Sequence, residues 1–453
     1  NIEYGHAHIA GGKLAESICL AIDYGVLKQI DLNDNRKHWD NDHIPGNDKL
    51  RDQVIRRELR VNEAELIDTA AMKLSFKRLN NMNYFETVEI IPKQVDPGTV
   101  DLDIKVKEKS TGTFSVGGGF SSLDKLGLVA DITEGNLGGR GQLLKIRGQL
   151  GQRRTSGVIT FREPYLFDDA LSAQVDIFAR QTFYTSYFER RRGADLVFGK
   201  WFSEILSGSA TYLLESVESS ADLSNQLFLG GGNVTSTPVS QLPPLVQQQL
   251  GTTITSAVIL GVARDTRDFH VDPKSGARHG LTLQFAGGPL GGDNAFYKVS
   301  GDTSWYFPMA WDTVFNPRTR VGYTHAYEAG SQVPVGDRYF VGGIQTVRGF
   351  KFGQAGPVAS DQSPLGGPKQ LIFNFDYIFP VSTEFKIKGV LFFDYGKGFN
   401  DGEAWNLDLR PAAGIEGRWI SPFGPLRLAY GFNLDPRPGE KNPVFEFSVG
   451  SLF

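Results

Sequence analysis

The sequence predicts a mainly β fold: a 16-stranded antiparallel transmembrane β-barrel preceded by a small α/β domain. Segments of about ten residues with alternating apolar and polar side chains recur from Thr111 to the end of the chain, as transmembrane strands do. Glycine, with 53 residues, and aromatic side chains, at 12%, are abundant, which suits many strands and turns. No stretch approaches the roughly 18 consecutive apolar residues of a membrane-spanning helix, and mean hydropathy is only -0.24.

The length of the repeating region sets the expected strand number. At roughly 20 residues for a strand and its connection, this region holds about 17 strands, and bacterial barrels favour even numbers, so we expect 16. A soluble β-sandwich would show the same alternation, because it also buries one face of each strand. The aromatic content and a final strand ending in Phe453 favour the membrane barrel. Alternation is clear in Leu171–Ile177, Leu281–Phe285 and Phe445–Val449.

Charge and composition exclude several classes of function. The formal net charge of -4 gives no basic excess for binding nucleic acid. The single cysteine, Cys19, cannot form an internal disulfide. No metalloprotease, serine-hydrolase, phosphate-loop or dinucleotide motif is present, so we predict no catalytic residue, no metal site and no cofactor. The chain begins at Asn1 without a methionine or a signal peptide, and we expect a mature or truncated product.

The N-terminal part divides into two stretches. Residues 1–40 are left unassigned, as a remnant or linker, although apolar spacing predicts a short helix over residues 12–27. The α/β domain is expected at residues 41–109, and the barrel at residues 110–453. Nothing in the α/β domain indicates catalysis.

Two helices and a hairpin are expected in the α/β domain. Residues 50–59 and residues 62–80 predict the helices. The second helix places Leu66, Ala70 and Leu74 on one apolar face. The hairpin strands, which alternate in polarity on either side of a turn, are residues 84–91 and 100–106.

The most informative stretch is Val347-Arg348-Gly349-Phe350, in a polar, glycine-rich loop between two alternating segments. Downstream, Asp376 and Asp394 each stand among apolar neighbours in adjacent strands, on the face opposite the aromatic side chains. Both carboxylates should therefore face the lumen, because a charge facing lipid is costly. Since an arginine fork can bridge two carboxylates, we predict that the loop folds into the barrel and that Arg348 meets both. The alternative is a solvated Arg348 and two aspartates that line a wet pore.

Two other charged stretches have plainer interpretations. The run Arg190-Arg191-Arg192 follows Glu189 and predicts a solvated strand end. The stretch Asp265-Thr266-Arg267-Asp268 lacks the ligand spacing of a calcium-binding loop, and predicts a polar strand end and turn.

The barrel must close by pairing its first strand, about residues 112–120, with its last, residues 444–453. Glycines in the first strand and a short last strand predict a weak seam. An exposed strand edge is a template for adding another strand, so such a seam could serve a function. The predicted seam residues are Gly112, Phe114, Val116, Gly117 and Gly118 in the first strand, and Phe445, Phe447, Val449, Gly450 and Phe453 in the last.

These stretches together resemble the BamA family, the central subunits of the bacterial machinery that assembles outer-membrane β-barrels. The resemblance covers the chain from about Gly46 to Phe453. Gly46–Glu58 and Arg78–Val88 resemble the last polypeptide-transport-associated (POTRA) domain of that family, and Val347–Phe350 resembles its hallmark loop. Further similar stretches are Thr111–Ser122 in the first barrel strand, Glu163–Asp169 in an early hairpin, Trp419–Leu426 in a late turn, and Phe445–Phe453 in the terminal strand.

The resemblance implies a non-enzymatic insertase of the bacterial outer membrane, with its POTRA domain in the periplasm. It implies unfolded outer-membrane protein clients, accessory lipoproteins, periplasmic chaperones and membrane lipid as partners. It also implies that acidic residues hold Arg348: Asp394 matches the family pattern, and Asp376 stands where the family commonly has Glu. Family members usually carry several POTRA domains, whereas this sequence shows one convincing copy, as expected of a truncated chain.

Two rival interpretations remain at this stage. A two-partner-type polypeptide secretion pore of the same superfamily would pass its substrate through the lumen, and such relatives usually have a plug helix, for which residues 12–27 are the candidate. A passive diffusion porin with a soluble appendage would need neither a weak seam nor the Arg348 motif.

Overall fold

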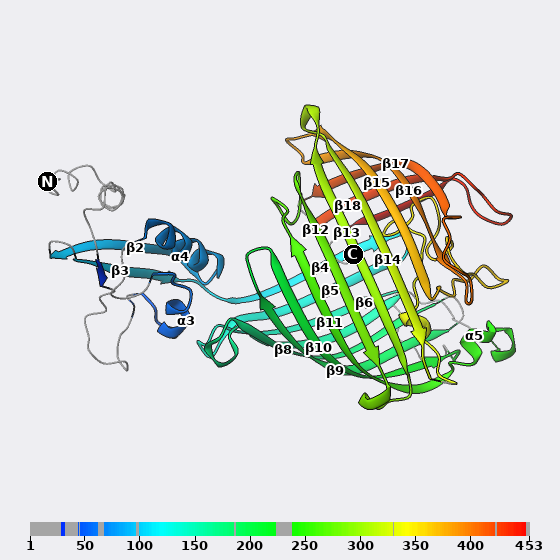
Figure 1. Cartoon of the computed structure of the whole chain (residues 1–453), viewed down its shortest axis with the longest axis horizontal. Coiled ribbons are helices and arrows are strands. Elements are labelled where there is room, and N and C mark those ends of the chain that lie inside the picture. The colour runs from blue at the N-terminus through cyan, green and yellow to red at the C-terminus, as the bar shows by residue number, and fades with distance from the viewer. Residues whose placement is uncertain are drawn as a thin grey trace. The chain divides into compact units, whose positions relative to one another are not determined.

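The computed structural model describes residues 29–31, 44, 46–61, 68–96, 99–184, 187–222, 238–328, 330–421 and 424–449. The chain forms two compact units, a small α/β unit and a β-barrel, and each is described by itself (Figure 1). No helix among the described residues is long and apolar enough to cross a membrane. The helix predicted over residues 12–27, Leu66 of the second predicted helix, and the seam residues Gly450 and Phe453 lie outside the described residues.

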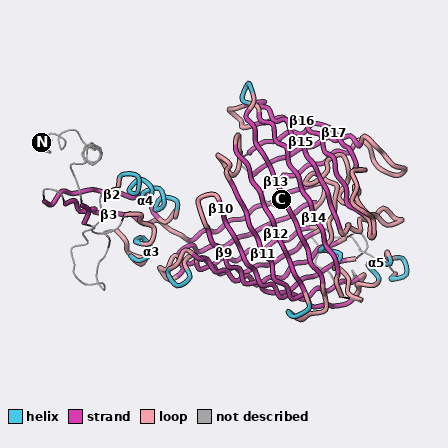
Figure 2. The backbone as a smooth tube through the Cα atoms, in the orientation of Figure 1, coloured by secondary structure: helices cyan, strands magenta, loops and turns pink. Residues whose placement is uncertain are grey.

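The α/β unit contains a three-stranded sheet, in which β3 lies between β1 and β2. Figure 2 shows β2 and β3 side by side. Strand β3 is antiparallel to β2, which forms the predicted hairpin, and parallel to β1. Strand β1 was not predicted, because three residues show too little alternation. Helix α3 is also shorter than predicted. The elements are β1 (Gln29–Asp31), α3 (Asp52–Arg56), α4 (Thr69–Asn81), β2 (Phe85–Asp96) and β3 (Thr99–Glu108).

Helix α4 packs against β2 through a different face from the one predicted. Leu79 and Ser75 are fully buried, whereas Ala70 is exposed and Leu74 is 38% exposed. The predicted apolar face was wrong because the prediction considered only apolar side chains and left out Ser75. The Ser75 hydroxyl donates a hydrogen bond of 2.8 Å to a backbone carbonyl of its own helix, so it can be buried at little cost.

The barrel is closed and antiparallel, and its 16 strands confirm the prediction from the sequence (Figure 1). Each strand pairs with its neighbours along the chain, and the last strand pairs with the first. The strands are β4 (Gly112–Ser121), β5 (Lys125–Leu137), β6 (Gln142–Gly151), β7 (Arg154–Glu163), β8 (Leu171–Phe183), β9 (Phe188–Trp201), β10 (Leu206–Ser220), β11 (Gly251–Asp265), β12 (Gly276–Ala286), β13 (Phe296–Pro308), β14 (Val314–Ala326), β15 (Lys369–Ser382), β16 (Ile387–Phe399), β17 (Arg410–Ser421), β18 (Gly424–Asn433) and β19 (Val444–Val449). Short helices lie in the connections: η2 (Leu166–Asp168), η3 (Val239–Gln241), α5 (Pro244–Gln247), η4 (Gly288–Leu290), η5 (Ala310–Asp312) and η6 (Val335–Asp337).

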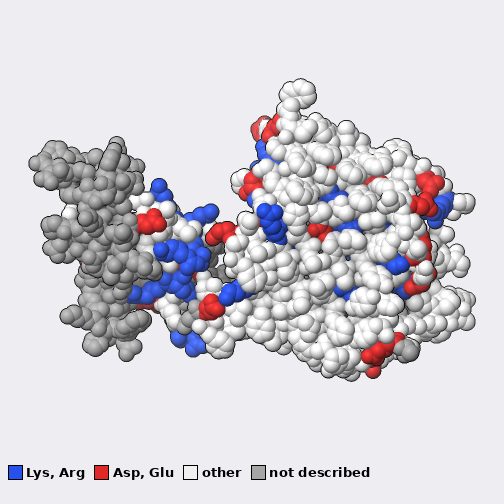
Figure 3. All heavy atoms as spheres, in the orientation of Figure 1, with Lys and Arg blue, Asp and Glu red and all other residues white. Residues whose placement is uncertain are grey.

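The barrel strands alternate between an apolar outer face and a more polar inner face. In β16, Leu391 and Phe393 are 51% and 41% exposed, whereas Phe392 and Asp394 are buried. The face of the barrel shown in Figure 3 is mostly uncharged over the strands. Exposed apolar side chains around a closed barrel are the pattern of a membrane-spanning wall.

The described part of the seam between β19 and β4 is short. Its register comprises two residue pairs among the described residues, Ser448 with Ser121 and Val449 with Phe120. A neighbouring pair of strands, β18 and β19, is paired from Leu426–Val449 to Gly431–Val444. The rings of Phe120 and Phe447 stack across the seam with centroids 5.4 Å apart.

The burial of Leu79 can be tested with a matched control on the same helix. Leu79→Ala should lower the free energy of unfolding of the α/β unit by about 2–5 kcal/mol, because it leaves a cavity under α4. Leu74→Ala makes the same chemical change on the exposed side, and should cost less than about 1 kcal/mol. Urea unfolding followed by the helical circular dichroism signal measures both, and equal losses would contradict the packing described.

Candidate functional site

The loop between β14 and β15 carries the Val347–Phe350 motif and is folded tightly on itself. The Gly342 amide donates to the Thr346 hydroxyl at 2.8 Å, and the Gly343 amide donates to the Val347 carbonyl at 3.1 Å. Both glycines have positive φ, 121° and 103°, which other residues rarely adopt. Val347 and Phe350 are buried in one cluster with Ile372 of β15 and Ala412 of β17. The loop is therefore packed against the inner side of the barrel wall.

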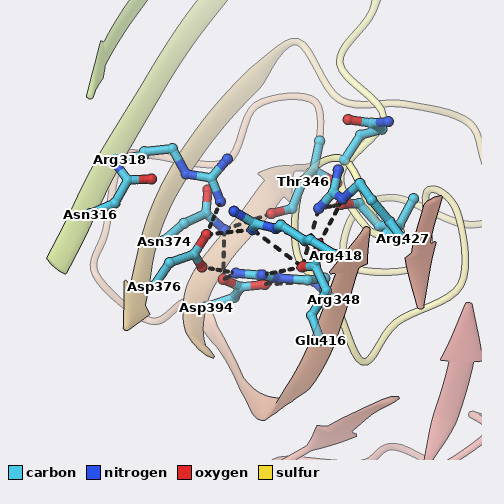
Figure 4. Close-up of polar contacts among 12 residues, drawn as sticks. Asn316, Arg318, Thr346, Arg348, Asn374, Asp376, Asp394, Glu416, Arg418 and Arg427 are labelled. Carbon is cyan, nitrogen blue, oxygen red and sulfur yellow. Dashed lines mark hydrogen bonds and ion pairs between the residues drawn. The ribbon is translucent and has the colours of Figure 1, made fainter. Parts of the chain in front are cut away.

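Arg348 is 1% exposed and binds three carboxylates from three consecutive strands (Figure 4). Its Nε and Nη2 atoms donate to the two oxygens of Asp394 in β16, at 2.8 and 2.6 Å. Nη2 also donates to Asp376 in β15 at 2.5 Å, and Nη1 donates to Glu416 in β17 at 2.7 Å. The guanidinium carbon lies 3.9 Å from the centroid of the Phe392 ring. Four charge-assisted hydrogen bonds therefore hold a guanidinium that is almost completely removed from solvent.

Three further arginines share these carboxylates. Arg318 of β14 and Arg418 of β17 donate to Asp376 Oδ2 at 3.0 and 2.8 Å. Arg418 and Arg427 of β18 donate to Glu416 Oε1 at 2.8 and 2.7 Å. Each of these two carboxylates therefore faces three guanidinium groups, and the cluster connects the loop to β14, β15, β16, β17 and β18. Figure 4 shows Arg348 among Asp376, Asp394 and Glu416.

Gly349 lets the loop backbone approach the wall. Its φ is 86°, and a Cβ added there would lie 3.1 Å from the Ala412 Cβ. A Cβ added to Gly431 of β18 would lie 2.5 Å from the Gly349 amide nitrogen. The Phe350 ring lies against the Arg410 guanidinium, and its centroid is 4.7 Å from the guanidinium carbon. No side chain fits at either glycine without displacing the loop.

The structure brings Arg348 together with Asp376 and Asp394, as the sequence suggested, and adds a third carboxylate that sequence reasoning missed. Strand alternation, which indicated that both aspartates face inward, would also have identified Glu416. In β17, Glu416 and Arg418 lie on the face opposite the outward Ile415. Among the described residues, no group of three or more His, Cys, Asp or Glu could hold a metal ion.

A second ionic cluster fixes the same loop to another part of the barrel wall. Arg191 of β9 donates to Glu189 at 2.6 Å, to Glu215 of β10 at 2.8 Å, and to Asp337 of the loop at 2.9 Å. Lys298 of β13 donates to the Asp337 carbonyl at 2.8 Å. The interpretation of the basic run as a solvated strand end is wrong for Arg191, whose side chain is only 18% exposed. The strand places it inward, where acidic partners from distant segments compensate its charge.

The charges around Asp337 also determine the pKa of its carboxyl group. Burial alone would raise the pKa of this carboxyl, but the charges of Arg191 and Lys298 outweigh burial and hold the pKa below its ordinary value. Asp337 is therefore ionised at neutral pH, and its pairing stabilises the folded protein there.

The predicted seam residues of β4 lie outside the two residue pairs described for the seam, and several of their side chains are exposed. Phe114 and Val116 are 70% and 67% exposed, and Gly112 and Gly118 are also exposed. On the β19 side, Phe445 is 55% exposed, and Phe447 and Val449 are half-buried.

A pocket of about 660 Å³ lies beside the seam, at the end of the barrel where β4 turns into β5. Its walls come from the ends of both seam strands and from the loop that follows the Arg348 motif. The lining residues include Ser122, Val444, Phe445, Glu446, Lys351 and Phe352.

Removing the Arg348 fork should weaken the barrel strongly. Arg348→Ala leaves buried carboxylates with fewer partners, so we expect a loss of about 3–5 kcal/mol, seen as a lower temperature of heat unfolding in detergent. Arg348→Lys should recover only part of the loss, because an ammonium cannot form the fork. The control is Arg320→Ala, which removes one bond to the Gln345 carbonyl and should cost about 1 kcal/mol. Equal effects of the two alanine variants would contradict the role of the fork.

The ion pairs of Asp337 predict that the wild type and an Asp337 variant differ in thermal stability, and that this difference depends on pH. Because the folded-state pKa of Asp337 is depressed, its stabilisation is present above the ordinary carboxyl pKa of about 4 and is lost as pH falls through the folded-state value. Asp337→Asn should therefore unfold at a lower temperature than the wild type at neutral pH, and this difference should shrink in acid. Glu328→Gln, at an exposed position of the same loop, is the control and should have little effect. A difference that does not change with pH would contradict the ion pairing.

Comparison with protein families matches both units. The Omp85 superfamily domain matches residues 136–453. The POTRA family, described as a surface antigen variable number repeat, matches residues 43–109.

Individual relatives agree with these matches. The chain is 30% identical over 448 residues to the outer membrane protein assembly factor BamA of Nitratidesulfovibrio vulgaris, covering 97% of this chain and 54% of the relative. It is 24% identical to the factor of the same name from Neisseria meningitidis, covering 99% of this chain and 60% of the relative. The chain thus spans about half the length of the curated relatives it matches.

Solved structures with the same fold include BamA from Haemophilus ducreyi lacking POTRA domains 1–3, at a TM-score of 0.73 and 22% identity, covering 94% of this chain and 84% of that one. CdiB from Acinetobacter baumannii shares the fold less closely, at a TM-score of 0.55 and 14% identity, covering 93% and 73%. The resemblance to BamA read from the sequence is confirmed, and the chain belongs to the Omp85 superfamily.

Proposed function

We propose that this protein assembles β-barrel proteins into the bacterial outer membrane, with residues 41–109 as a periplasmic POTRA domain and residues 110–453 as the membrane barrel. The relatives named as outer membrane protein assembly factors support this function. No bond-making chemistry is part of the proposal. The partners are unfolded outer-membrane proteins, the periplasmic chaperones that deliver them, accessory lipoproteins and the surrounding lipid.

The observation that carries the proposal is the short seam. Among the described residues, two residue pairs join β19 to β4, and the side chains of Phe114 and Val116 in β4 are largely exposed. A strand edge with free backbone groups is a template for another strand. In the proposal, the seam opens sideways, the last strand of a client pairs with the edge of β4, and later client strands follow. A mismatch between the hydrophobic height of the seam and the bilayer would thin the membrane there and ease insertion.

Among the described residues, the ion pairs of the loop reach many barrel strands but neither β4 nor β19. The Arg348 cluster connects β14, β15, β16, β17 and β18, and the Asp337 cluster connects β9, β10 and β13. Both clusters belong to one loop, so the loop braces a large part of the wall from inside. Neither cluster includes β4, so opening between β19 and β4 breaks neither set of ion pairs.

The POTRA domain offers a second place for strand addition. In the order β1-β3-β2, strand β2 pairs only with β3 within the described sheet and forms an edge. We propose that an extended client segment pairs with this edge before it reaches the barrel.

The rival function is a secretion pore that passes polypeptide through the lumen. The fold similarity to CdiB is compatible with it, but the TM-score of 0.55 is lower than the 0.73 of the BamA structure. The loop and its ion clusters also occupy the lumen, which favours a path through the wall over a path through the pore.

A disulfide across the seam tests the proposal. Ser121 and Ser448 are paired, buried and similar in size to cysteine, so Ser121→Cys with Ser448→Cys in a Cys19→Ser background should crosslink. Opposed residues lie about 4.5–5.5 Å apart between Cα atoms, within the range of a disulfide. We expect client insertion into liposomes to fall at least about tenfold on oxidation and to return on reduction.

The control is a crosslink away from the seam. Thr303 and Thr319 are opposed in β13 and β14, and the matching cysteine pair should leave insertion unchanged when oxidised. Loss of activity in both variants would indicate a general need for barrel flexibility. Full activity of the locked seam would reject lateral opening and favour the lumen pore.

A further inference from the structure

The pocket of about 660 Å³ beside the seam, called the basic pocket below, is built at one end of the barrel. Its lining comes from the ends of the seam strands, the turns after β4, β6 and β8, the loop after β14 and the connection after β18. These connections share one end, because hairpins of an antiparallel barrel alternate between its ends. Strand β4 begins at the other end, directly after the POTRA domain, so the pocket belongs to the end away from the periplasm.

The basic pocket extends across the seam and carries an excess of positive charge. Lys125 follows β4, whereas Phe445 and Glu446 belong to β19. Among the described lining residues, four are basic and only Glu446 is acidic. Lys125, Lys351 and Lys441 are exposed, and over the described part of the chain neither Lys351 nor Lys441 forms an ion pair. A recess lined by one sign of charge attracts ligands of the opposite sign.

The fourth basic residue, Arg153, is held between aromatic rings. Its guanidinium carbon lies 4.2 Å from the centroid of the Phe352 ring and 5.9 Å from that of Tyr184. Its Nη1 atom is buried and has no hydrogen-bond partner among the described residues. The same is true of the hydroxyl of Tyr187, a residue that is only 4% exposed. Because an unpaired buried donor is costly, both groups suit a ligand whose negatively charged oxygens accept hydrogen bonds.

Glu446 supplies a different kind of group in the same wall. It is 7% exposed, and its Oε2 atom has no hydrogen-bond partner among the described residues. A carboxylate oxygen accepts a hydrogen bond, so it suits a hydroxyl group of the ligand. The lining therefore fits a headgroup that carries both an anionic phosphate ester and hydroxyl groups.

An apolar groove on the outer wall borders the basic pocket. This outer groove has a volume of about 410 Å³, crosses β15 to β19 and shares Phe445 with the pocket. Gly389 and Gly417, which are opposed in β16 and β17, line it. A Cβ added to Gly417 would meet no atom within 4 Å, so the space above this glycine is open. The outward side chains along the groove include Leu391, Ile415, Leu428 and Tyr430.

We propose that the seam binds a lipid whose headgroup combines a phosphate ester with hydroxyl groups. The headgroup occupies the basic pocket, where Arg153 and Tyr187 donate to phosphate oxygens and a hydroxyl donates to Glu446. One acyl chain lies in the outer groove, and Phe445 contacts the lipid where headgroup and chain meet. A lipid in this position contacts both seam strands and stabilises the closed seam. The inference concerns lipid binding alone and does not rest on the proposed assembly activity.

The headgroup site is tested by titrating the full chain in detergent with phosphatidylglycerol and counting bound lipids by native mass spectrometry. Phosphatidylcholine with the same acyl chains has a phosphate ester but no hydroxyl and no net charge, and should bind at least about tenfold more weakly. Arg153→Gln should weaken phosphatidylglycerol binding by a similar factor. Arg154→Gln is the matched control, because Arg154 is exposed, pairs with Asp124 at 3.3 Å and does not line the pocket.

Equal binding of the two lipids, or equal losses in the two arginine variants, would overturn the proposal. If Arg153→Gln does not fold, Lys351→Gln combined with Lys441→Gln removes charge from exposed positions and should give the same weakening. Inorganic phosphate is added as a competitor. Displacement of phosphatidylglycerol by an equal concentration of inorganic phosphate would show a site for a free anion and would also reject the lipid.

The acyl chain is tested separately by filling the outer groove. Gly417→Leu should weaken binding of long-chain phosphatidylglycerol at least about fivefold and leave a short-chain form unaffected, because it takes the space of the chain. Gly157→Leu is the control, since Gly157 of β7 also has open space around it and lies outside the groove. An equal effect of both leucine variants would remove the chain from the groove. Client insertion plays no part in these measurements, so they are independent of the seam crosslink.

Discussion

The buried charge of Arg348 constrains the C-terminal half of the barrel. A guanidinium removed from water is tolerated only when it is paired and fully hydrogen-bonded. Asp376, Asp394 and Glu416 satisfy this need from β15, β16 and β17, and arginines of β14, β17 and β18 compensate the excess negative charge. A shift of one residue in any of these strands would turn its charged side chain toward lipid. Arg348 thus links three strands directly, and the arginines that share its carboxylates extend the cluster to β14 and β18.

The loop that carries Asp337 and Arg348 is bound by ion pairs to two groups of barrel strands. Asp337 joins the loop to β9, β10 and β13, and Arg348 joins it to the strands from β14 to β18. Between β19 and β4, by contrast, the described contacts are two residue pairs, one stacked pair of rings and the hydrogen bonds between Ser122 and Phe447. The ion clusters of the loop brace many strands but not this junction, and the proposed activity uses this junction.

Sequence reasoning predicted the barrel, its strand number and the inward direction of Asp376 and Asp394, because alternation with period 2 is a local property of each strand. It missed Glu416, although the alternation in β17 indicates that this side chain faces inward. It also missed the partners of Arg191, since these contacts join segments far apart in the chain and no local pattern reports such pairing. It also chose the wrong face of α4, because Ser75 looks polar in sequence but satisfies its hydroxyl within the helix. Periodicity identifies which residues share a face, whereas the identity of a partner across the lumen depends on how the barrel closes.

The close approach of Gly349 to Gly431 has a consequence for how the chain itself folds. The loop backbone lies against β18 with no room for even a methyl group, and Arg348 is enclosed by three strands. Docking of the loop and correct pairing of the strands around it therefore depend on each other. A substitution that displaces Gly349 from β18 should disturb this part of the wall as well as the loop itself.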